Sequence, residues 1–280
     1  MAFSFFSTGA TSEVNFIPEI FSKLLQAKFY ATSVLPEISN TDYEGSITGA
    51  GDKVVVRTVP TVTINDYAGS ITTQDLTTAK VELLIDKAKY YSFLNDDVLA
   101  AQSDINLMEE AAKDAAEGMR VAVETQVLAD VVAGAGTTGS DTTVTTSNIL
   151  AEILGFAKTL DENNVPEEGR FIVLSPEFIS MLKQTELRQA YLTGDDESPL
   201  RNGKVGMVDR FTVYTSNMLS VASGYTKVLA GHKKGITFAS QFTNTEEVRM
   251  ESKFGSQVRG LKCFGSKVIV PDCLIAGSWT

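Results

Sequence analysis

The spacing of hydrophobic residues predicts two helices in the first half of the chain. Between residues 14 and 29, apolar side chains recur at intervals of three and four, which predicts an amphipathic helix that begins near Pro18. The same spacing from 103 to 133 predicts one helix of roughly 45 Å, far longer than an average helix. The apolar stripe of this long helix consists of Ile105, Met108, Ala112, Ala115, Met119, Val123, Val127 and Val131.

The segment after the long helix alternates between polar and apolar stretches. Residues 134–148 are rich in Gly, Thr and Ser, and they predict a flexible loop. An apolar face over 149–160 predicts a third helix, and a continuous apolar run at 171–174 predicts a buried strand. A proline then begins a short helix over 176–182, because proline suits a first helical turn.

Two β-rich runs enclose a polar segment in the first third of the chain. The run at 54–59 and the alternating pattern at 81–94 predict a strand and a returning strand. Between them, 66–79 is polar, rich in threonine and free of lysine and arginine. Fourteen polar residues exceed the usual hairpin connection, so we expect an exposed β-excursion with a partner of its own.

The last quarter of the chain predicts a series of short strands. Its pattern combines with the earlier helices into an α+β fold with a late antiparallel block, without internal repeats or regular βαβ alternation. The expected late strands are 211–214, 228–230, 236–238, 247–251, 258–264 and 267–270.

The charge of the chain is negative and unevenly distributed. The 280 residues carry a net charge of −11, and residues 41–140, with sixteen acidic and seven basic side chains, account for −9 of it. Such a chain is a poor sequence-independent binder of nucleic acid, because neutralising the phosphates requires clustered cations. The acidic region is either an ordinary solvated face or a surface that repels polyanions or receives a basic partner.

Other classes of protein are excluded by simple features of the sequence. Two cysteines, Cys263 and Cys273, cannot make a disulfide framework. No apolar run approaches the roughly 20 residues of a membrane helix, and no basic segment precedes the first phenylalanines as in a signal peptide. We therefore expect a soluble, acidic protein made in a reducing compartment.

Two glycine-containing motifs resemble phosphate-binding loops without meeting their requirements. The glycines 134, 136 and 139 match the dinucleotide fingerprint, but a helix precedes them where a strand is needed, so we interpret them as a flexible helix terminator. The string 260–267 has serine and lysine in the wrong order for a P-loop. We expect no cofactor.

Candidate catalytic and metal-binding residues are few. His232 is the only histidine, and with the two cysteines it has no recognised metal-ligand spacing, so we expect it on an exposed turn. No Gly-x-Ser-x-Gly elbow is present. Adjacent acidic pairs do not form a preset dyad, because neighbours diverge on helices and strands; these pairs are Asp96–Asp97, Glu109–Glu110, Asp195–Asp196 and Glu246–Glu247. We expect neither a metal site nor an enzyme.

Several short strings occur in a characteristic order along nearly the whole chain. They are FIPEIF at 16–21 with Pro36, GDKVVVR at 51–57, DKAKYYSF at 86–93 with Asp96 and Asp97, NVPEEGR at 164–170 with LSP at 174–176, GKVGMVDRFTVYTSN at 203–217, and Gly260–Leu261 with VPD at 270–272. Each string is weak alone, and their order together is fairly specific. In this order the sequence resembles the major capsid proteins of tailed bacteriophages with the Hong Kong 97 fold, in the branch without a large inserted domain.

The resemblance implies a division of the chain into five parts. It implies an N-terminal arm at 1–40, a peripheral-domain strand with an extended loop at 41–102, and a spine helix of the peripheral domain at 103–133. The remaining two parts are an axial domain at 134–240 and returning peripheral-domain strands at 241–280.

The resemblance also implies a function and partners. Copies of the chain are expected to form pentamers and hexamers of an icosahedral shell in the virion, assembled in the host cytoplasm around double-stranded DNA that is not bound sequence-specifically. A scaffolding protein and a portal are implied as partners, decoration proteins stay open, and no membrane is involved. One alternative is a cargo-encapsulating shell of the same fold; another, from a different class, is an acidic α+β hydrolase.

Two sets of residues follow as candidate sites. The first comprises intersubunit contacts in the arm and the excursion: Phe3, Phe5, Phe6, Asp66, Tyr67, Ile71, Gln74, Asp75 and Leu76. The second is an acidic inner face or scaffold-docking surface: Glu109, Glu110, Asp114 and Glu117. Some relatives cross-link subunits through a loop lysine; because 66–79 contains none, we expect no such cross-link.

Overall fold

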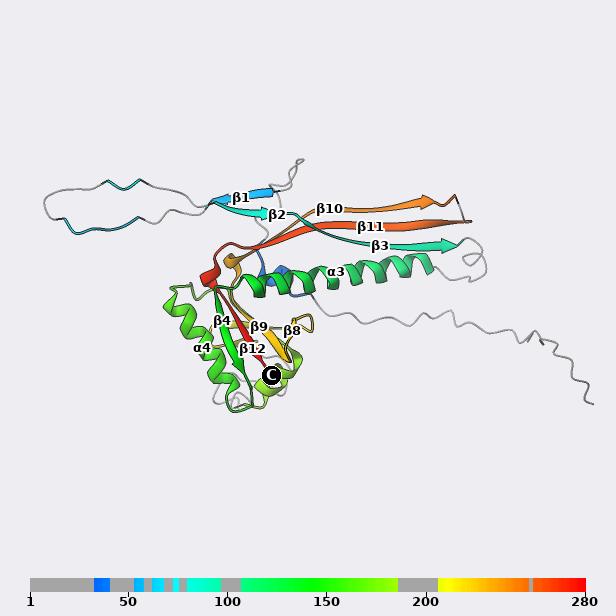
Figure 1. Cartoon of the computed structure of the whole chain (residues 1–280). Coiled ribbons are helices and arrows are strands. Elements are labelled where there is room, and N and C mark those ends of the chain that lie inside the picture. The colour runs from blue at the N-terminus through cyan, green and yellow to red at the C-terminus, as the bar shows by residue number, and fades with distance from the viewer. Residues whose placement is uncertain are drawn as a thin grey trace, which may run out of the picture.

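The computed structural model describes eight segments of the chain, and they form an α+β structure with two sheets and a projecting hairpin (Figure 1). The predicted fold class is confirmed. The described segments are 33–40, 53–57, 62–67, 73–75, 80–96, 107–185, 206–251 and 254–280. The helix expected at 14–29 lies outside them.

The long part of the molecule is a three-stranded antiparallel sheet with one long helix beside it (Figure 1). Its strands are β10 (Ile236–Arg249), β11 (Gly255–Val268) and β3 (Lys87–Asp96), in that order. The helix α3 (Leu107–Gly134) corresponds to the one expected at 103–133. Of its apolar stripe, the residues up to Met119 whose side chains are described are half-buried, whereas Val123, Val127 and Val131 are buried, because a second layer covers only that end.

The compact part of the molecule is built on a seven-stranded mixed sheet. Strands β12 and β4 are parallel to each other, as are β5 and β7, and all other neighbouring strands of this sheet are antiparallel. The order is β4 (Thr137–Thr142), β12 (Leu274–Trp279), β9 (Tyr225–His232), β5 (Arg170–Leu174), β7 (Phe211–Thr215) and β6 (Met207–Val208), with β8 (Val221–Ala222) paired to β9.

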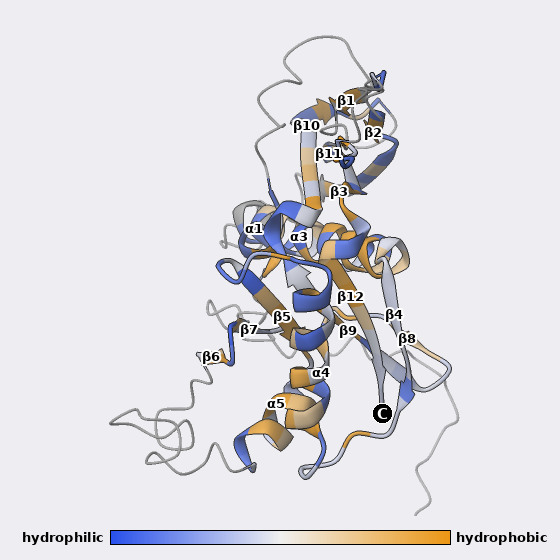
Figure 2. Ribbon diagram, turned by 90° about the vertical axis from the view of Figure 1, so that its left-hand side faces the viewer, coloured by the Kyte–Doolittle hydropathy of each residue, from blue (hydrophilic) through white to orange (hydrophobic). Residues whose placement is uncertain are grey.

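Both faces of the seven-stranded sheet are covered. Ile172 and Leu174 of β5 pack with α4 (Ile149–Glu162) and α5 (Pro176–Lys183), and Phe171 and Val173 pack with α1 (Leu35–Ile38) and the end of α3. Figure 2 shows apolar residues concentrated in β12 and α5. Alternate residues of a strand point to opposite faces, so a strand covered on both sides is apolar throughout.

The projecting hairpin is formed by β1 (Lys53–Arg57) and β2 (Lys80–Leu84), which pair antiparallel. The described residues between these strands lie beyond one end of the long sheet (Figure 1). The two short 3-10 helices Lys233–Gly235 and Pro271–Cys273 lie where the chain passes between the two sheets.

Several predicted elements are confirmed at their expected positions. Helix α4 buries the apolar face expected for the third helix, β5 is the buried strand, and α5 begins at Pro176. Ser175 caps α5 by accepting a hydrogen bond from the Phe178 N–H. The exposed excursion between two pairing strands is also present in its described residues.

The prediction of a flexible loop at 134–148 is wrong for the residues that form β4. The Gly136 N–H donates to the Pro271 carbonyl at 3.0 Å, and β4 then runs parallel to β12. A Thr- and Ser-rich segment shows no hydrophobic alternation, so only the neighbouring strand makes it a strand.

The late strands differ from the predictions in length and in destination. The four short strands expected between 236 and 270 are the two fourteen-residue strands β10 and β11. Residues 241–280, expected as returning peripheral-domain strands, are divided between the two sheets, and β12 pairs with β9 and β4 in the compact part. Strand β12 is buried on both faces, whereas buried and more exposed residues alternate along residues 257–261 of β11.

Candidate assembly surfaces

The described part of the excursion exposes large apolar side chains. Ile64 is 94% exposed, and Val62 and Tyr67 are also exposed. Within the excursion, the Thr63 N–H donates to Gln74 Oε1 at 3.0 Å. Of the predicted contact residues, the exposed ones are Asp66, Tyr67, Gln74 and Asp75, whereas Phe3, Phe5, Phe6, Ile71 and Leu76 lie outside the described residues.

The outer face of the three-stranded sheet is a second exposed apolar surface, which the sequence analysis missed. Tyr90, Leu94, Val248 and Leu261 are all exposed on the face that points away from α3. Tyr90 is opposite Leu261, while Leu94 and Val248 flank Gln257. A groove of about 460 Å³ in this sheet is lined by Tyr90, Tyr91, Ser92, Glu246, Gln257, Arg259, Gly260 and Leu261. The sequence contains one sign of this surface. Over 87–94, each face of the strand carries both polar and apolar residues, so neither face is fully polar.

A charged row crosses the same outer face between the apolar residues. Arg259 Nε donates to Glu246 Oε1 at 3.1 Å, and Gln257 Nε2 donates to Ser92 Oγ at 2.6 Å. Glu246 therefore acts as the partner of an arginine, and its neighbour Glu247 points to the opposite face, as expected for adjacent residues of a strand.

The acidic residues predicted as an inner face lie along the first half of α3. Glu110 pairs with Lys113 at 3.3 Å, and Glu117 pairs with Arg120 at 2.6 Å. Asp114 is partly buried, and the side chain of Glu109 lies outside the described ones. The structure therefore brings Glu110, Asp114 and Glu117 onto one helix surface, and two of their charges are balanced by basic residues one turn further on.

Glu124 fastens the segment before α1 to the long helix. Its side chain is buried, and its carboxylate accepts hydrogen bonds from the Ser33 hydroxyl and, at 2.9 Å, from the Val34 N–H. In the sequence, Glu124 is only one more negative charge of the acidic region. Its partners lie 90 and 91 positions away, so no local pattern could identify it.

A polar cluster joins the long helix to the long sheet, near the point where β2 leads into β3. Lys87 forms an ion pair with Asp130 of α3, and Asp130 also accepts from Ser266 Oγ at 3.2 Å and from Gln126 Nε2 at 3.3 Å. A cleft of about 540 Å³ lies beside this cluster. Its walls are formed by Val81, Lys87, Asp130, Val131, Ala133, Gly134, Ser266, Lys267, Val268, Ile269 and Pro271.

A second polar cluster closes the turn before β5. The buried Arg170 pairs with Asp161 at 2.7 Å and donates to the Val165 and Pro166 carbonyls. Arg210 bridges Asp161, at 2.9 Å, and Glu167, at 2.7 Å. The hydrogen bond from Arg170 is the main reason that the pKa of Asp161 lies below its ordinary value. These contacts are structural: they hold the turn whose residues matched the resemblance at 164–170.

His232 is buried, so the expectation of an exposed turn is wrong. Its Nε2–H donates to the Glu168 carbonyl at 2.8 Å, and its Nδ1 accepts from the Lys234 N–H at 3.1 Å. Burial lowers the pKa of His232, and the neighbouring charges of Lys234 and Arg170 act in the same direction. Both ring nitrogens are occupied within the fold, which explains why the ring lies inside rather than on the turn.

The glycines of the two rejected phosphate motifs have packing roles. A side chain at Gly136 would lie 2.6 Å from the Pro271 carbonyl oxygen, and one at Gly265 would overlap the Leu84 carbonyl. In both places another stretch of backbone passes close by. Among the described residues, no group of His, Cys, Asp and Glu could hold a metal ion, and Cys263 and Cys273 are both free thiols.

The helices of the described segments include none that is long and apolar enough to cross a membrane. The exposed apolar residues named above lie on a sheet face and in the excursion. They are the surfaces most in need of a protein partner, since soluble monomers rarely expose large apolar patches.

Comparison with known proteins gives consistent matches. Residues 79–275 match the sequence model of a family described as phage capsid protein. A solved structure from Mycobacterium phage Che8 is 26% identical, with a TM-score of 0.85 over 94% of this chain and 97% of that one. The capsid of Cyanophage P-SCSP1u is 16% identical, with a TM-score of 0.79 over 95% and 93%. The mature capsid of bacteriophage PhiM1 is 14% identical, with a TM-score of 0.73 over 97% and 94%. None of the curated proteins compared with the chain matches it.

Proposed function

We propose, because the chain belongs to the phage capsid protein family, that its copies assemble as pentamers and hexamers of an icosahedral shell that encloses double-stranded DNA. The family and the capsid fold make it a structural capsid protein of the virion. The symmetry of the shell, its contents and its assembly partners are the parts that we propose.

The exposure of the excursion carries the assembly part of the proposal. Its described residues leave Ile64 almost completely exposed, and Val62 and Tyr67 are mostly exposed as well. Within one subunit nothing described covers these side chains, and a closed ring of copies offers each excursion a neighbour's surface. The exposed row of Tyr90 and Leu261 on the long sheet supports the same conclusion.

The charge supports enclosure of DNA without attachment to it. The chain has a net charge of −11 at pH 7, which opposes binding to phosphates. Glu110, Asp114 and Glu117 on α3 are the proposed inner face or docking surface for a basic scaffolding protein. Because Glu110 and Glu117 already pair with Lys113 and Arg120, a scaffold would have to compete with these ion pairs. Scaffold, portal and host-cytoplasm assembly rest on the family resemblance.

Electron microscopy of the purified chain tests the proposal directly. We expect closed particles built of pentamers and hexamers, alone or when genes encoded beside it are expressed together with it. Packaged DNA is then tested by nuclease protection of particles from infected cells. A chain that stays monomeric under all these conditions would contradict the proposal, and shells that hold protein cargo instead of DNA would support the encapsulating alternative.

A further inference from the structure

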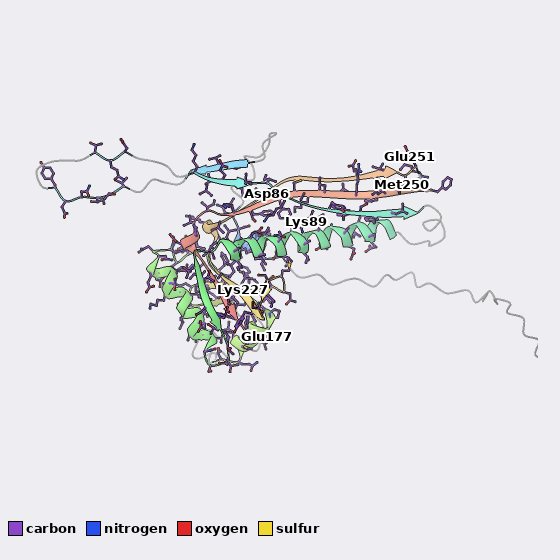
Figure 3. The ribbon with its side chains drawn as sticks, in the orientation of Figure 1. Asp86, Lys89, Glu177, Lys227, Met250 and Glu251 are labelled. Carbon is purple, nitrogen blue, oxygen red and sulfur yellow. The ribbon has the colours of Figure 1, made fainter. Side chains whose placement is uncertain are left out.

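The chain crosses from the compact sheet to the long sheet through one short turn, and His232 closes that turn. Strand β9 ends at His232, the 3-10 helix η3 (Lys233–Gly235) follows, and β10 begins at the next residue. Figure 3 shows both ends of this path, with Lys227 of β9 in the compact part and Glu251 at the far tip of the long sheet. The turn is therefore the whole covalent connection between these two strands.

The hydrogen bonds of His232 require the neutral ring with its proton on Nε2. The Nδ1 atom accepts from the Lys234 N–H at 3.1 Å, so it cannot itself carry a proton. The Nε2 atom lies 2.8 Å from the Glu168 carbonyl oxygen, which can only accept, so this nitrogen donates. The ring thereby connects the turn before β5 to η3 and caps the first residues of η3.

The charged groups that act on the ring are both cations. From the described elements packed around it, they are Arg170 of β5 and Lys234 of η3, whereas Glu168 contributes its backbone carbonyl. Arg170 is the register partner of His232, and its buried side chain already pairs with Asp161 at 2.7 Å. A proton on the ring would therefore add a positive charge beside two others, with no carboxylate paired to it in the described part of the chain.

Backbone hydrogen bonds connect η3 to the neighbouring crossings of the chain. The Ile269 N–H donates to the Gly235 carbonyl at 2.9 Å, and the Gly136 N–H donates to the Pro271 carbonyl at 3.0 Å. Gly235 also packs against Cys273, since a side chain there would lie 3.2 Å from the Cys273 Cβ. The crossing from β9 to β10 is thus fastened to the one from β11 to β12, and that one to the crossing from α3 to β4.

We propose that His232 is a proton-sensitive cap of η3, which keeps the crossing from β9 to β10 closed at neutral pH and opens it in mild acid. A proton taken up from solution by Nδ1 makes this nitrogen a donor that faces a second donor, the Lys234 N–H. The turn then opens, the bond between Gly235 and Ile269 is reached by water, and Cys273 loses its cover. The strands of both sheets stay paired, so the opening is local. Its consequence for particles rests on the proposed function: each subunit of a shell has a looser crossing in mild acid.

The test uses the unassembled full-length chain, so its outcome does not depend on whether shells form. His232 is the only histidine, so NMR of the isotope-labelled imidazole reports its tautomer and charge without ambiguity. Hydrogen exchange at pH 7.5 and 5.5, corrected for the intrinsic rates, compares residues 233–237 with residues 171–174 of β5. The matched control is H232Q, which keeps one donor and one acceptor but does not titrate in this range.

We expect the tautomer with its proton on Nε2 at pH 7.5. Between pH 7.5 and 5.5, exchange at 233–237 should rise by about five- to fifty-fold more in the wild type than in H232Q, the factor expected when a buried hydrogen bond is lost. Exchange at 171–174 should rise far less, because β5 stays paired. In a C263A background, the Cys273 thiol should react faster with dithiodipyridine at pH 5.5 than it does in C263A with H232Q at the same pH.

Three results would overturn the proton-sensitive cap. A proton on Nδ1 at pH 7.5 would show that the ring does not cap η3. The same pH dependence of exchange at 233–237 in the wild type and H232Q would show that the histidine does not control the turn. Equal acceleration at 171–174 and 233–237 would show that acid destabilises the whole compact part. If no shells form while the expected local results are obtained, the proposed function fails and the cap stands.

Discussion

The ring of Tyr91 lies across Gly260 of the neighbouring strand, in the space where any other residue would carry its side chain. Beyond the glycine, the Tyr91 hydroxyl lies 3.3 Å from Thr245 Oγ1 on the third strand, and the ring stacks with Phe93 at a centroid distance of 6.3 Å. One aromatic side chain thus spans all three strands of the long sheet on the face toward α3.

Replacement of Gly260 tests this arrangement. We expect Gly260→Ala to destabilise the subunit by about 1–3 kcal/mol, because the new methyl group displaces the Tyr91 ring. Gly118 of α3 is the matched control, since a methyl group there meets nothing within 4 Å. Gly118→Ala is expected to stabilise by about 0.5–1 kcal/mol. Denaturant unfolding measures both, and equal effects of the same sign would contradict the packing role of Gly260.

Removal of the Glu124 carboxylate tests the attachment of the segment before α1. We expect Glu124→Ala to cost about 1–3 kcal/mol, because the Val34 N–H loses its partner inside the protein. Glu110→Ala, on the exposed part of the same helix, changes stability by less than about 0.5 kcal/mol. Hydrogen exchange should accelerate at 34–38 in the first variant only. Unchanged exchange there would show that Glu124 does not fasten this segment.

The single histidine predicts a loss of stability in mild acid. His232 has a pKa below its ordinary 6.5 in the folded state, mainly because burial disfavours its charged form. The unfolded chain therefore takes up the proton first, so stability is intact above pH 6.5 and decreases as the pH falls from there toward the folded pKa. Unfolding measured from pH 7.5 to 5.5 should show this decrease.

His232→Gln provides the control for the pH effect. Glutamine keeps one donor and one acceptor near the Glu168 carbonyl and the Lys234 N–H but does not titrate in this range. The decrease in stability between pH 6.5 and 5.5 should be smaller in this variant than in the wild type. Identical pH profiles, or an imidazole resonance titrating above pH 6.5, would show that burial does not control this group.

Changes in the excursion test its role in shell closure. Deletion of 66–78 should leave a soluble subunit that forms no closed shells, because each copy loses the segment that reaches its neighbour. Ile64→Ser is the sharper variant, since Ile64 is almost fully exposed and its loss should leave the unfolding free energy within about 0.5 kcal/mol. Electron microscopy should show fewer shells at equal stability. Normal shells from both variants would remove the excursion from the interface.

The absence of lysine from 66–79 predicts shells without a loop-lysine cross-link. Lys53 and Lys80 lie in the strands at the base of the excursion rather than at its tip. Mature particles heated in detergent should show the coat subunit as a single monomer band, without covalent multimers. A ladder of covalent multimers would contradict this prediction.

Elements with a strong local pattern could be read from the sequence. The apolar face of α4 and the run in β5 are set by residues within a few turns, so periodicity alone located them. The exposure of Asp66 and Tyr67 was equally predictable, since a polar segment with few apolar residues cannot bury itself. The order of the predicted helices and strands also determined the α+β class.

Contacts between distant segments were decided only by the tertiary structure. Strand β12 pairs with β9 in the compact sheet, and β4 forms because β12 lies beside it there. Tyr90 and Tyr91 are adjacent aromatic residues, yet one is exposed and the other half-buried, since α3 covers a single face of their sheet. The Val34 N–H bound by Glu124 lies 90 positions away along the chain, and the Glu168 carbonyl bound by His232 lies 64 positions away. The sequence by itself determined local conformation and the need for partners, and tertiary packing determined which partners were available.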